Sequence, residues 1–326
     1  LRNTTYMIMG SRGCPFSCSY CANNVYKKLY LSQNRLRFRS PENVIAELRQ
    51  AKDKYNFRMV EFFDDVLTTN ESRLKALLRL YRRQINLPFT CDLHPQLVTQ
   101  NTIKLLKKSG CCWLKLGVQS ANENYRKKYL QRYETNNDII KASRWCNQNR
   151  LPFSLDHIFN LPGETEENLI EAVKLYNICR PTVINFGTLI YLPGTDIIYH
   201  GLKFKNITAK DVKNINLGRD PVAHMSNIEL FSHQSRHNRQ NNISVFAALF
   251  MIITVIPGFI PNLLIRLKIY RLNFHFPQFV LVFLKILAKI RAHQIYLYLY
   301  FFKTFIYYLT HPGESDYYLD HQLKYS

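Results

Sequence analysis

Three closely spaced cysteines are the residues of this chain best suited to chemistry. Cys14, Cys18 and Cys21 form a Cys-x3-Cys-x2-Cys loop. Three thiolates can hold three irons of a [4Fe–4S] cluster. The fourth iron then has no ligand from the loop, so it can chelate a small molecule and pass it an electron. The alternative is a zinc site completed by a distant His or Cys, but zinc motifs usually contain paired Cys-x2-Cys units, and no second pair of suitable spacing follows.

The five other cysteines do not extend this motif. They are Cys91, Cys111, Cys112, Cys146 and Cys179. An even number of cysteines suggests disulfides in a small secreted protein, but this chain has 326 residues and places three cysteines within eight positions. That pattern favours a metal or cluster site in a reducing compartment. We therefore expect a cytoplasmic protein.

The loop also resembles a known family. Residues 12–21 read RGCPFSCSYC, which resembles the signature of the radical S-adenosylmethionine (SAM) superfamily. The RGCP start and the aromatic residue before the last cysteine resemble its cobalamin (B12)-binding branch. The resemblance covers about residues 5–200. It implies a radical SAM enzyme in which a [4Fe–4S] cluster binds SAM and cleaves it to methionine and a 5′-deoxyadenosyl radical, with an electron donor such as flavodoxin or ferredoxin.

Further residues match the family in places where it contacts SAM. By this resemblance, Asp64 or Asp65 holds the SAM amino group, since a carboxylate can accept from an ammonium. Gln119 and Ser120, in the stretch LGVQS, meet the ribose or the methionine part. Arg132 pairs with the SAM carboxylate, because its guanidinium is planar and always charged. The alternatives are a helix N-terminal charge or a turn for the two aspartates and a solvated surface arginine for Arg132.

Weaker candidates complete the expected cofactor site. Tyr20 can offer ring or backbone contact to adenine, and Asp156 points to the mouth or into the barrel. Gly163, in the turn LPGET, allows a close approach of the backbone to a ligand. His94 follows the third strand and either touches substrate or is a structural histidine.

Alternating apolar and amphipathic segments must position these residues. Short, β-branched and aromatic runs predict buried parallel strands at Thr5–Met9, Arg58–Phe63, Pro88–Asp92, Trp113–Val118, Phe153–Ile158 and Val183–Ile190. Amphipathic runs with capping residues predict helices at 41–54, 70–84, 99–109, 136–149 and 165–179.

This alternation predicts an α/β fold, a partial (β/α)6 TIM-like barrel, for residues 1–200. Ligands of such folds bind at the carboxyl ends of the strands. The cysteine loop directly follows the first strand, so it lies at that end. We expect this region to be the radical SAM core domain.

The C-terminal third differs in composition. Residues 201–240 indicate a basic linker, and 241–326 a mostly helical, basic and apolar region. The net charge is +21, and residues 230–313 contain nine Lys or Arg and no acid. Basic and apolar residues together favour an anionic membrane surface over nucleic acid. Residues 241–265 carry no charge, so a spanning helix, a peripheral segment at the inner face of the membrane and a helical cap on the barrel are all open.

Three functions compete. The first is a cobalamin-branch-like methyltransferase or C–H-modifying enzyme acting on a hydrophobic small molecule or lipid. No Asp-x-His-x-x-Gly cobalamin segment occurs, and in that branch the cobalamin domain would precede Leu1. The second is a cobalamin-independent radical SAM oxidoreductase or methylthiotransferase. The third, of another class, is a non-catalytic metal-binding or membrane-tethering protein.

Overall fold

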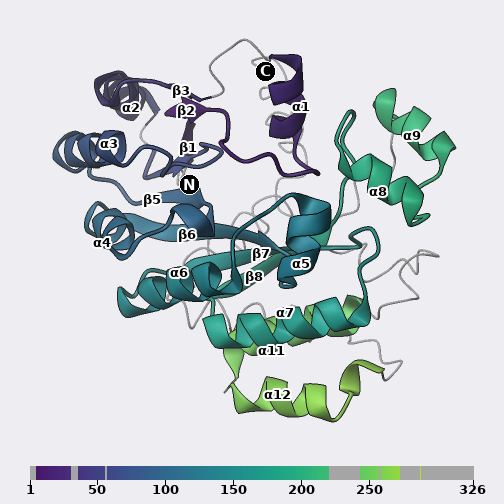
Figure 1. Cartoon of the computed structure of the whole chain (residues 1–326). Coiled ribbons are helices and arrows are strands. Elements are labelled where there is room, and N and C mark those ends of the chain that lie inside the picture. Colours follow the sequence, from purple (N-terminus) through teal and green to yellow (C-terminus); the bar gives the residue numbers. More distant parts are fainter. Residues whose placement is uncertain are drawn as a thin grey trace, which may run out of the picture.

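A computed structural model describes residues 5–30, 36–55, 57–219, 243–256, 258–271 and 287. Its centre is a six-stranded parallel sheet in the order β1-β4-β5-β6-β7-β8. These strands are Thr5–Ile8 (β1), Met59–Phe62 (β4), Phe89–Leu93 (β5), Cys111–Gln119 (β6), Phe153–Phe159 (β7) and Val183–Thr188 (β8). Each strand pairs in parallel with the next one in this order, as expected for an open partial barrel (Figure 1).

Helices between the strands cover one face of the sheet (Figure 1). They are Pro41–Tyr55 (α2), Glu71–Gln84 (α3), Gln100–Lys108 (α4), Asn136–Gln148 (α6) and Glu166–Cys179 (α7). Side chains of Asn70, Thr99 and Thr135 cap the N-termini of α3, α4 and α6 by accepting backbone N–H groups. Capping residues satisfy donors that a helix leaves free in its first turn. The α/β fold and all six strands predicted from the sequence are therefore confirmed.

Several elements are additional to the predicted set. The chain forms a short helix at Ala22–Leu29 (α1) and a two-stranded ribbon of Ser11–Arg12 (β2) and Arg37–Phe38 (β3). Ile197–Lys203 (α8) and Ala209–Asn216 (α9) follow the sheet, and α9 lies within the expected linker 201–240. The helix α1 escaped prediction because its Asn-Asn-Val start has weak helix propensity. It is stabilised instead by its contacts with the cysteine loop.

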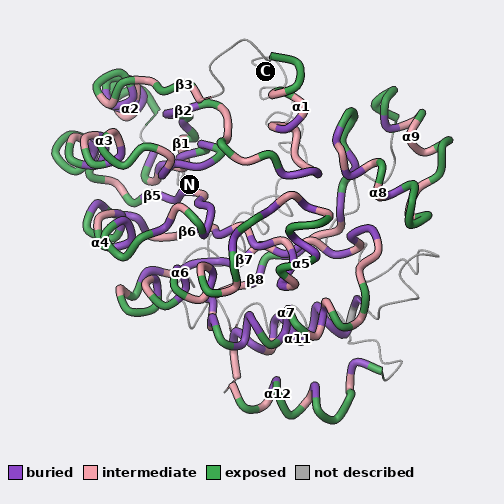
Figure 2. The backbone as a smooth tube through the Cα atoms, viewed as in Figure 1, coloured by how far each residue is buried: buried purple, intermediate pink, exposed green. Residues whose placement is uncertain are grey.

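The core lies between the sheet and its covering helices. Side chains of β5 that point to the helices, such as Phe89 and Cys91, are fully buried, and Leu93 is nearly so. On the other face Met7 and Phe63 remain about half exposed, at 54% and 50%. Figure 2 shows the same division, with buried segments along the sheet and exposed outer turns on the helices. The covered face therefore supplies stability, and the other face is free for a ligand.

The C-terminal helices add to this core. Helix α11 (Ile243–Val255) packs against α7 and β8, and helix α12 (Phe259–Arg266) follows it. Phe250 is fully buried and stacks on Phe159, with ring centroids 5.3 Å apart. The uncharged run 241–265 is thus divided between two helices, and in the part of the chain described here no helix is both long and apolar enough to cross a bilayer. Apart from a short 3-10 turn at Ile269–Arg271 and residue 287, the rest of the expected region 241–326 lies outside the described residues.

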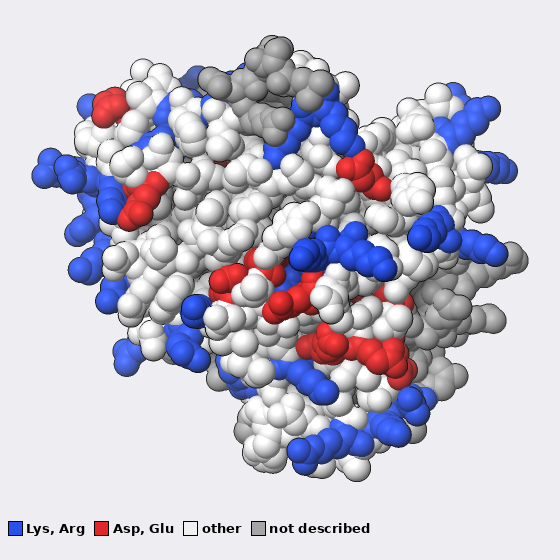
Figure 3. Space-filling view, viewed as in Figure 1, with Lys and Arg blue, Asp and Glu red and all other residues white. Residues whose placement is uncertain are grey.

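Basic side chains lie mainly around the periphery of the face seen in Figure 3, and acidic side chains form a band across its centre. Many of the basic side chains gather at the left of this view around α3, which carries Arg73, Lys75, Arg79, Arg82 and Arg83. One of these residues, Arg73, reaches the segment after β1, where it donates to the Gly10 carbonyl at 2.6 Å. The uneven charge therefore does not by itself identify a binding site.

Candidate active site

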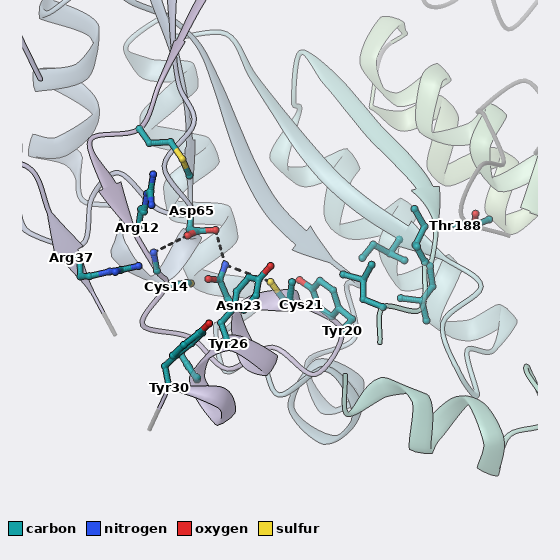
Figure 4. Close-up of a pocket in the computed structure, with 18 residues that line it drawn as sticks. Arg12, Cys14, Tyr20, Cys21, Asn23, Tyr26, Tyr30, Arg37, Asp65 and Thr188 are labelled. Carbon is teal, nitrogen blue, oxygen red and sulfur yellow. Dashed lines mark hydrogen bonds between the residues drawn. The ribbon is translucent and has the colours of Figure 1, made fainter. Parts of the chain in front are cut away.

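The cysteine loop covers a cavity at the carboxyl end of the sheet (Figure 4). The cavity has a volume of about 920 Å³. Its walls come from the loop and the ribbon, from α1, and from the ends of β7 and β8. The lining residues are Met9, Arg12, Gly13, Cys14, Tyr20, Cys21, Ala22, Asn23, Tyr26, Lys27, Tyr30, Arg37, Asp65, Ile158, Thr188, Leu189, Ile190 and Leu192. Its size suits a small-molecule ligand.

The loop is held by hydrogen bonds at both of its ends. Cys21 is the N-cap of α1, and its backbone N–H donates to the Cys18 carbonyl over 3.1 Å. Lys27 of α1 reaches back and donates to the Phe16 carbonyl and to Ser17 Oγ. The backbone of Ser19 donates to the Leu130 carbonyl over 3.0 Å. The short helix α1 therefore serves to hold the cysteine loop.

The three thiols suit a cluster better than a solvated surface site. Burial raises the pKa of Cys14 to about 11 and raises the pKa of Cys18 as well. The thiols of the loop lie close together, so that charge on Cys18 raises the pKa of Cys14 and charge on Cys21 raises the pKa of Cys18. Among the described residues, no set of three His, Cys, Asp or Glu side chains converges on one metal ion. A four-iron cluster does not need ligands that converge on one ion, because each thiolate binds a different iron.

Asp64 and Asp65 follow β4 and both contact the segment before Cys14. Asp64 is buried and accepts hydrogen bonds from the Gly10 N–H at 3.0 Å and from Ser11 Oγ. Burial raises the pKa of its carboxyl group. Asp65 instead lines the cavity, where it accepts from Asn23 Nδ2 at 2.6 Å and from the Gly13 N–H at 3.1 Å. Of the two residues left open by the sequence, Asp65 is therefore the one that faces the cavity.

Arg132 is buried behind the loop rather than exposed in the cavity. Its guanidinium donates to Glu134 Oε1 at 2.7 Å, to the Gly117 carbonyl at 2.6 Å and to Tyr20 Oη at 3.1 Å. The same group lies 3.8 Å from the Cys18 sulfur. The alternative of a solvated surface arginine is wrong, because the side chain is 5% exposed. Arg132 links the end of β6 to the cysteine loop, and direct contact with a SAM carboxylate stays a prediction.

A buried charge cluster surrounds Arg132. Glu134, fully buried, also lies 3.6 Å from the guanidinium of Arg126 and 3.4 Å from His94 Nε2. Burial beside the two arginines lowers the pKa of His94 to about 2, so its ring is neutral. His94 Nδ1 accepts the Gln96 N–H, which leaves the proton on Nε2, facing Glu134. His94 also stacks on Phe16, with ring centroids 3.7 Å apart, so it packs under the loop as a structural histidine.

The end of β6 has an unusual backbone. Gln119 adopts a left-handed conformation with φ of 70°, and the pairing with β7 shifts between Gly117 and Gln119. Ser120 is buried, and its carbonyl accepts from Arg126 at 2.6 Å. Strained backbone of this kind is common at functional sites. Neither Gln119 nor Ser120 is among the residues that line the cavity, so their contact with SAM stays a prediction.

Asp156 and Gly163 also lie away from the cavity wall. Asp156 is on the open face of β7, where Asn185 Nδ2 of β8 donates to it over 2.9 Å, and burial raises its pKa. Gly163 has φ of 72°, and a β-carbon there would lie 2.7 Å from the ring of Phe204. The structure thus explains this glycine by chain packing, whereas the sequence suggested a ligand.

Sequence reasoning missed three residues that shape the site. Asn23, Arg126 and Glu134 hold the loop or its support. Asn23 sits beside the cysteines, and this proximity is a usable signal. Arg126 and Glu134 have no such signal, because they lie in a polar stretch without periodicity. Only the fold shows that they are buried.

Comparison with known proteins agrees with this geometry. A family model, the radical SAM superfamily, matches residues 8–176. An uncharacterized methyltransferase of Pyrococcus horikoshii is 26% identical over 190 residues, which are 58% of this chain and 40% of that protein. The bacteriochlorophyllide d C-8(2)-methyltransferase of Chlorobaculum tepidum is 26% identical over 223 residues, 63% of this chain and 46% of that protein. The chain therefore spans less than half the length of these two relatives.

A solved structure shares the fold. The radical S-adenosylmethionine methyltransferase TsrM of Kitasatospora setae, determined with cobalamin and a [4Fe–4S] cluster bound, superimposes with a TM-score of 0.53. The identity is 19%, and the match covers 60% of this chain and 36% of that chain. At this level of identity, the likeness shows a shared fold.

Proposed function

Because this chain belongs to the radical SAM superfamily, we propose that it is a radical SAM enzyme whose cluster is held by Cys14, Cys18 and Cys21. The observation that carries the proposal is the position of these thiols. They lie on one loop, which covers a cavity of about 920 Å³ at the carboxyl end of a parallel sheet. When bound, the cluster supplies the electron that cleaves SAM to methionine and a 5′-deoxyadenosyl radical.

The residues around the cavity have distinct tasks in this proposal. Asp65 keeps a carboxylate at the wall, where it orients Asn23 and can meet the SAM amino group. Tyr20 lines the cavity, and its hydroxyl accepts from Arg132, so its ring is held in the wall, where it can meet the adenine of SAM. Arg132 itself positions the loop through Cys18. The wall from β7 and β8 is mostly apolar and excludes water from the reacting groups.

The test is anaerobic reconstitution of the chain with iron and sulfide. We expect an iron–sulfur absorbance, an electron paramagnetic resonance signal that changes on addition of SAM, and formation of 5′-deoxyadenosine. Changing Cys14, Cys18 or Cys21 to alanine should abolish all three. Cys112→Ala is the matched control, since this half-buried thiol lies on β6 outside the loop. Loss of iron in the Cys112 variant, or a full cluster in a loop variant, would refute the ligand set.

For the reaction, we infer methyl transfer or another C–H modification on a small molecule with an apolar body. Two relatives are named methyltransferases, which supports methyl transfer, and the apolar cavity wall supports the substrate class. The test uses the full-length protein, SAM, cobalamin and a reductant. Methyl transfer from SAM gives S-adenosylhomocysteine beside 5′-deoxyadenosine, whereas other C–H chemistry gives 5′-deoxyadenosine alone. Either product pattern in the absence of added cobalamin would favour the cobalamin-independent alternative.

A separate observation supports peripheral contact with an anionic membrane. On α12 and just after it, Phe259, Leu263 and Leu267 recur every four residues and are 70%, 48% and 63% exposed. The basic residues Arg266 and Lys268 lie beside them. Apolar side chains can insert into the interface while basic groups meet lipid phosphates. We expect salt-sensitive co-sedimentation with anionic liposomes, weakened in Phe259→Ser, and an absence of pelleting at low salt would refute this contact.

A further inference from the structure

Two arginines face each other at the rim of the cavity. In the ribbon of β2 and β3, Arg12 is directly opposite Arg37. Like charges at directly opposite positions of an antiparallel pair repel each other. Both side chains line the cavity, and both residues are exposed (Figure 4). The chain therefore concentrates two positive charges where a ligand enters.

The described part of the chain gives this pair no counter-ion. Asp65 is the acid in the cavity wall, but its two oxygens already accept from Asn23 and from the Gly13 N–H. Neither Arg12 nor Arg37 makes an ion pair with any of the described residues.

The next arginine along the chain shows the contrast. Arg39 forms an ion pair with Glu47 at 2.6 Å and hydrogen bonds with Asn43. A counter-ion next to the ribbon is therefore available in the fold, and it is used by Arg39, which is not among the residues that line the cavity. Among the described residues, nothing neutralises the charge at the rim, so it is available to a ligand.

The neighbouring wall narrows the chemistry of that ligand. Tyr26 and Tyr30 lie one helical turn apart at the α1 side of the cavity, and both are more than half exposed. A pair of guanidinium groups binds planar or tetrahedral oxyanions through paired N–H donors. Two tyrosine rings offer a flat surface for an apolar body. The rim is thus suited to a molecule that has both features.

We propose that Arg12 and Arg37 together bind the carboxylate or phosphate of the substrate, whose apolar body lies against Tyr26 and Tyr30. This inference rests on the proposed function, because it takes the cavity as the substrate site. SAM also has a carboxylate, and that is the other source of an oxyanion. By the family resemblance, the SAM carboxylate is expected to pair with Arg132, so the arginine pair at the rim is left for the substrate.

The experiment compares octyl phosphate and octanoate with octanol and octylammonium as probes. Binding to the reconstituted full chain, with SAM present, is measured by isothermal titration calorimetry below the micelle concentration of each probe. We expect the two anions to bind more tightly than octanol, and octylammonium to bind least. The double change Arg12→Gln with Arg37→Gln should weaken octyl phosphate binding roughly tenfold or more, as expected for the loss of a charged hydrogen-bonded contact. Octanol binding should stay unchanged.

Three further variants sharpen the result. Arg49→Gln, an exposed arginine on α2 outside the cavity, removes the same charge and should leave every probe unaffected. The double change Arg12→Lys with Arg37→Lys keeps both charges but loses the paired N–H donors. Its affinity for octyl phosphate should therefore fall between that of the parent protein and that of the double glutamine variant. The single changes Arg12→Gln and Arg37→Gln report on each residue if the double variant does not fold. Iron content and circular dichroism check that each variant is loaded and folded.

Two outcomes would overturn the inference. Equal affinity of the parent protein for octanol and octyl phosphate would mean that no anion site exists. A loss of SAM affinity in the double variant, with octyl phosphate binding unchanged, would assign the pair to the SAM carboxylate. Failure of the proposed function is seen separately, in the parent protein, as the absence of a cluster or of SAM cleavage. Octyl phosphate binding that depends on the arginines could persist in that case, so the two failures are distinguishable.

Discussion

Replacing Glu134 with alanine removes the carboxylate that faces Arg126, Arg132 and His94. Its nearest partner is Arg132, with 2.7 Å between Nε and Oε1, and the side chains of Glu134 and Arg126 are fully buried. The change leaves two guanidinium groups in the interior without their counter-ion. Breaking a buried ion pair from one side costs about 3–5 kcal/mol. We expect a loss of this size in the free energy of unfolding.

Two related variants bracket that magnitude. Glu134→Gln keeps an oxygen that can accept from Arg132 but loses the charge, so it should cost about 1–3 kcal/mol. Glu71→Ala is the exposed control, because Glu71 and Lys75 form an ion pair with side chains 58% and 56% exposed. Such surface pairs contribute less than about 1 kcal/mol. The expected order of stability loss is therefore Glu134→Ala, then Glu134→Gln, then Glu71→Ala.

The assay is urea unfolding followed by circular dichroism, together with alkylation of Cys18 by iodoacetamide. Arg132 contacts the Cys18 sulfur, so a loosened Arg132 should expose a thiol that is now 8% exposed. Each 1.4 kcal/mol lost from the local opening free energy makes alkylation about tenfold faster. A Glu134→Ala variant that is destabilised by less than about 1 kcal/mol and keeps the parent alkylation rate would refute the bracing role of this cluster.

Three other predictions follow from the fold. Burial lowers the pKa of His157 to about 3, below its ordinary value of 6.5, so the folded state binds fewer protons than the unfolded state between these values. Stability should then fall by about 1.4 kcal/mol per pH unit as the pH drops from 6.5 towards 3, and His157→Gln should remove that part of the slope in urea titrations at several pH values. Gly163→Ala should lower the free energy of unfolding by about 1–3 kcal/mol, because it strains a residue at φ of 72° and places a β-carbon against the Phe204 ring. In a double-mutant cycle, Phe204→Ala should restore the steric part of this loss, and full additivity of the two changes would refute the clash. Phe250 is fully buried and Phe259 is exposed, so Phe250→Ala should lower the free energy of unfolding by about 3–5 kcal/mol and Phe259→Ala by less than about 0.5 kcal/mol. Thermal or urea unfolding measures both losses, and equal values would show that α11 is not part of the core.

Much of the fold was predictable because short apolar runs and capping residues act locally. Asn70 and Thr99 cap the helices that their side chains predicted, and β7 occupies Phe153–Phe159 against an expected end at Ile158. The ribbon of β2 and β3 was not predictable, because each strand has two residues and the pairing joins positions 25 and 27 residues apart. Such pairing depends on the tertiary fold rather than on local sequence.

The candidate site divides in the same way. Cys14, Cys18 and Cys21 could be found from spacing alone, and the acidic pair after β4 from its place at a strand end. Arg132 was found as a residue, but its burial was not foreseen, because neither the charge nor the position of an arginine predicts whether a fold encloses it. Glu134 escaped notice because buried carboxylates are rare and carry no sequence signature.

The strand ends divide the cavity into two sides with different tasks. On the first side, the residues that follow β4 and β5 contact the cysteine loop or the segment before it; they are Asp64, Asp65 and His94. The end of β6 is linked to the loop by Arg132, which donates to the Gly117 carbonyl. The ends of β7 and β8 make none of these contacts and instead supply apolar lining, such as Ile158 and Leu189. Changes on the first side should therefore alter cluster loading or SAM binding. Changes on the second side should leave both intact and alter which substrate is accepted, so the two groups of variants separate cofactor chemistry from specificity.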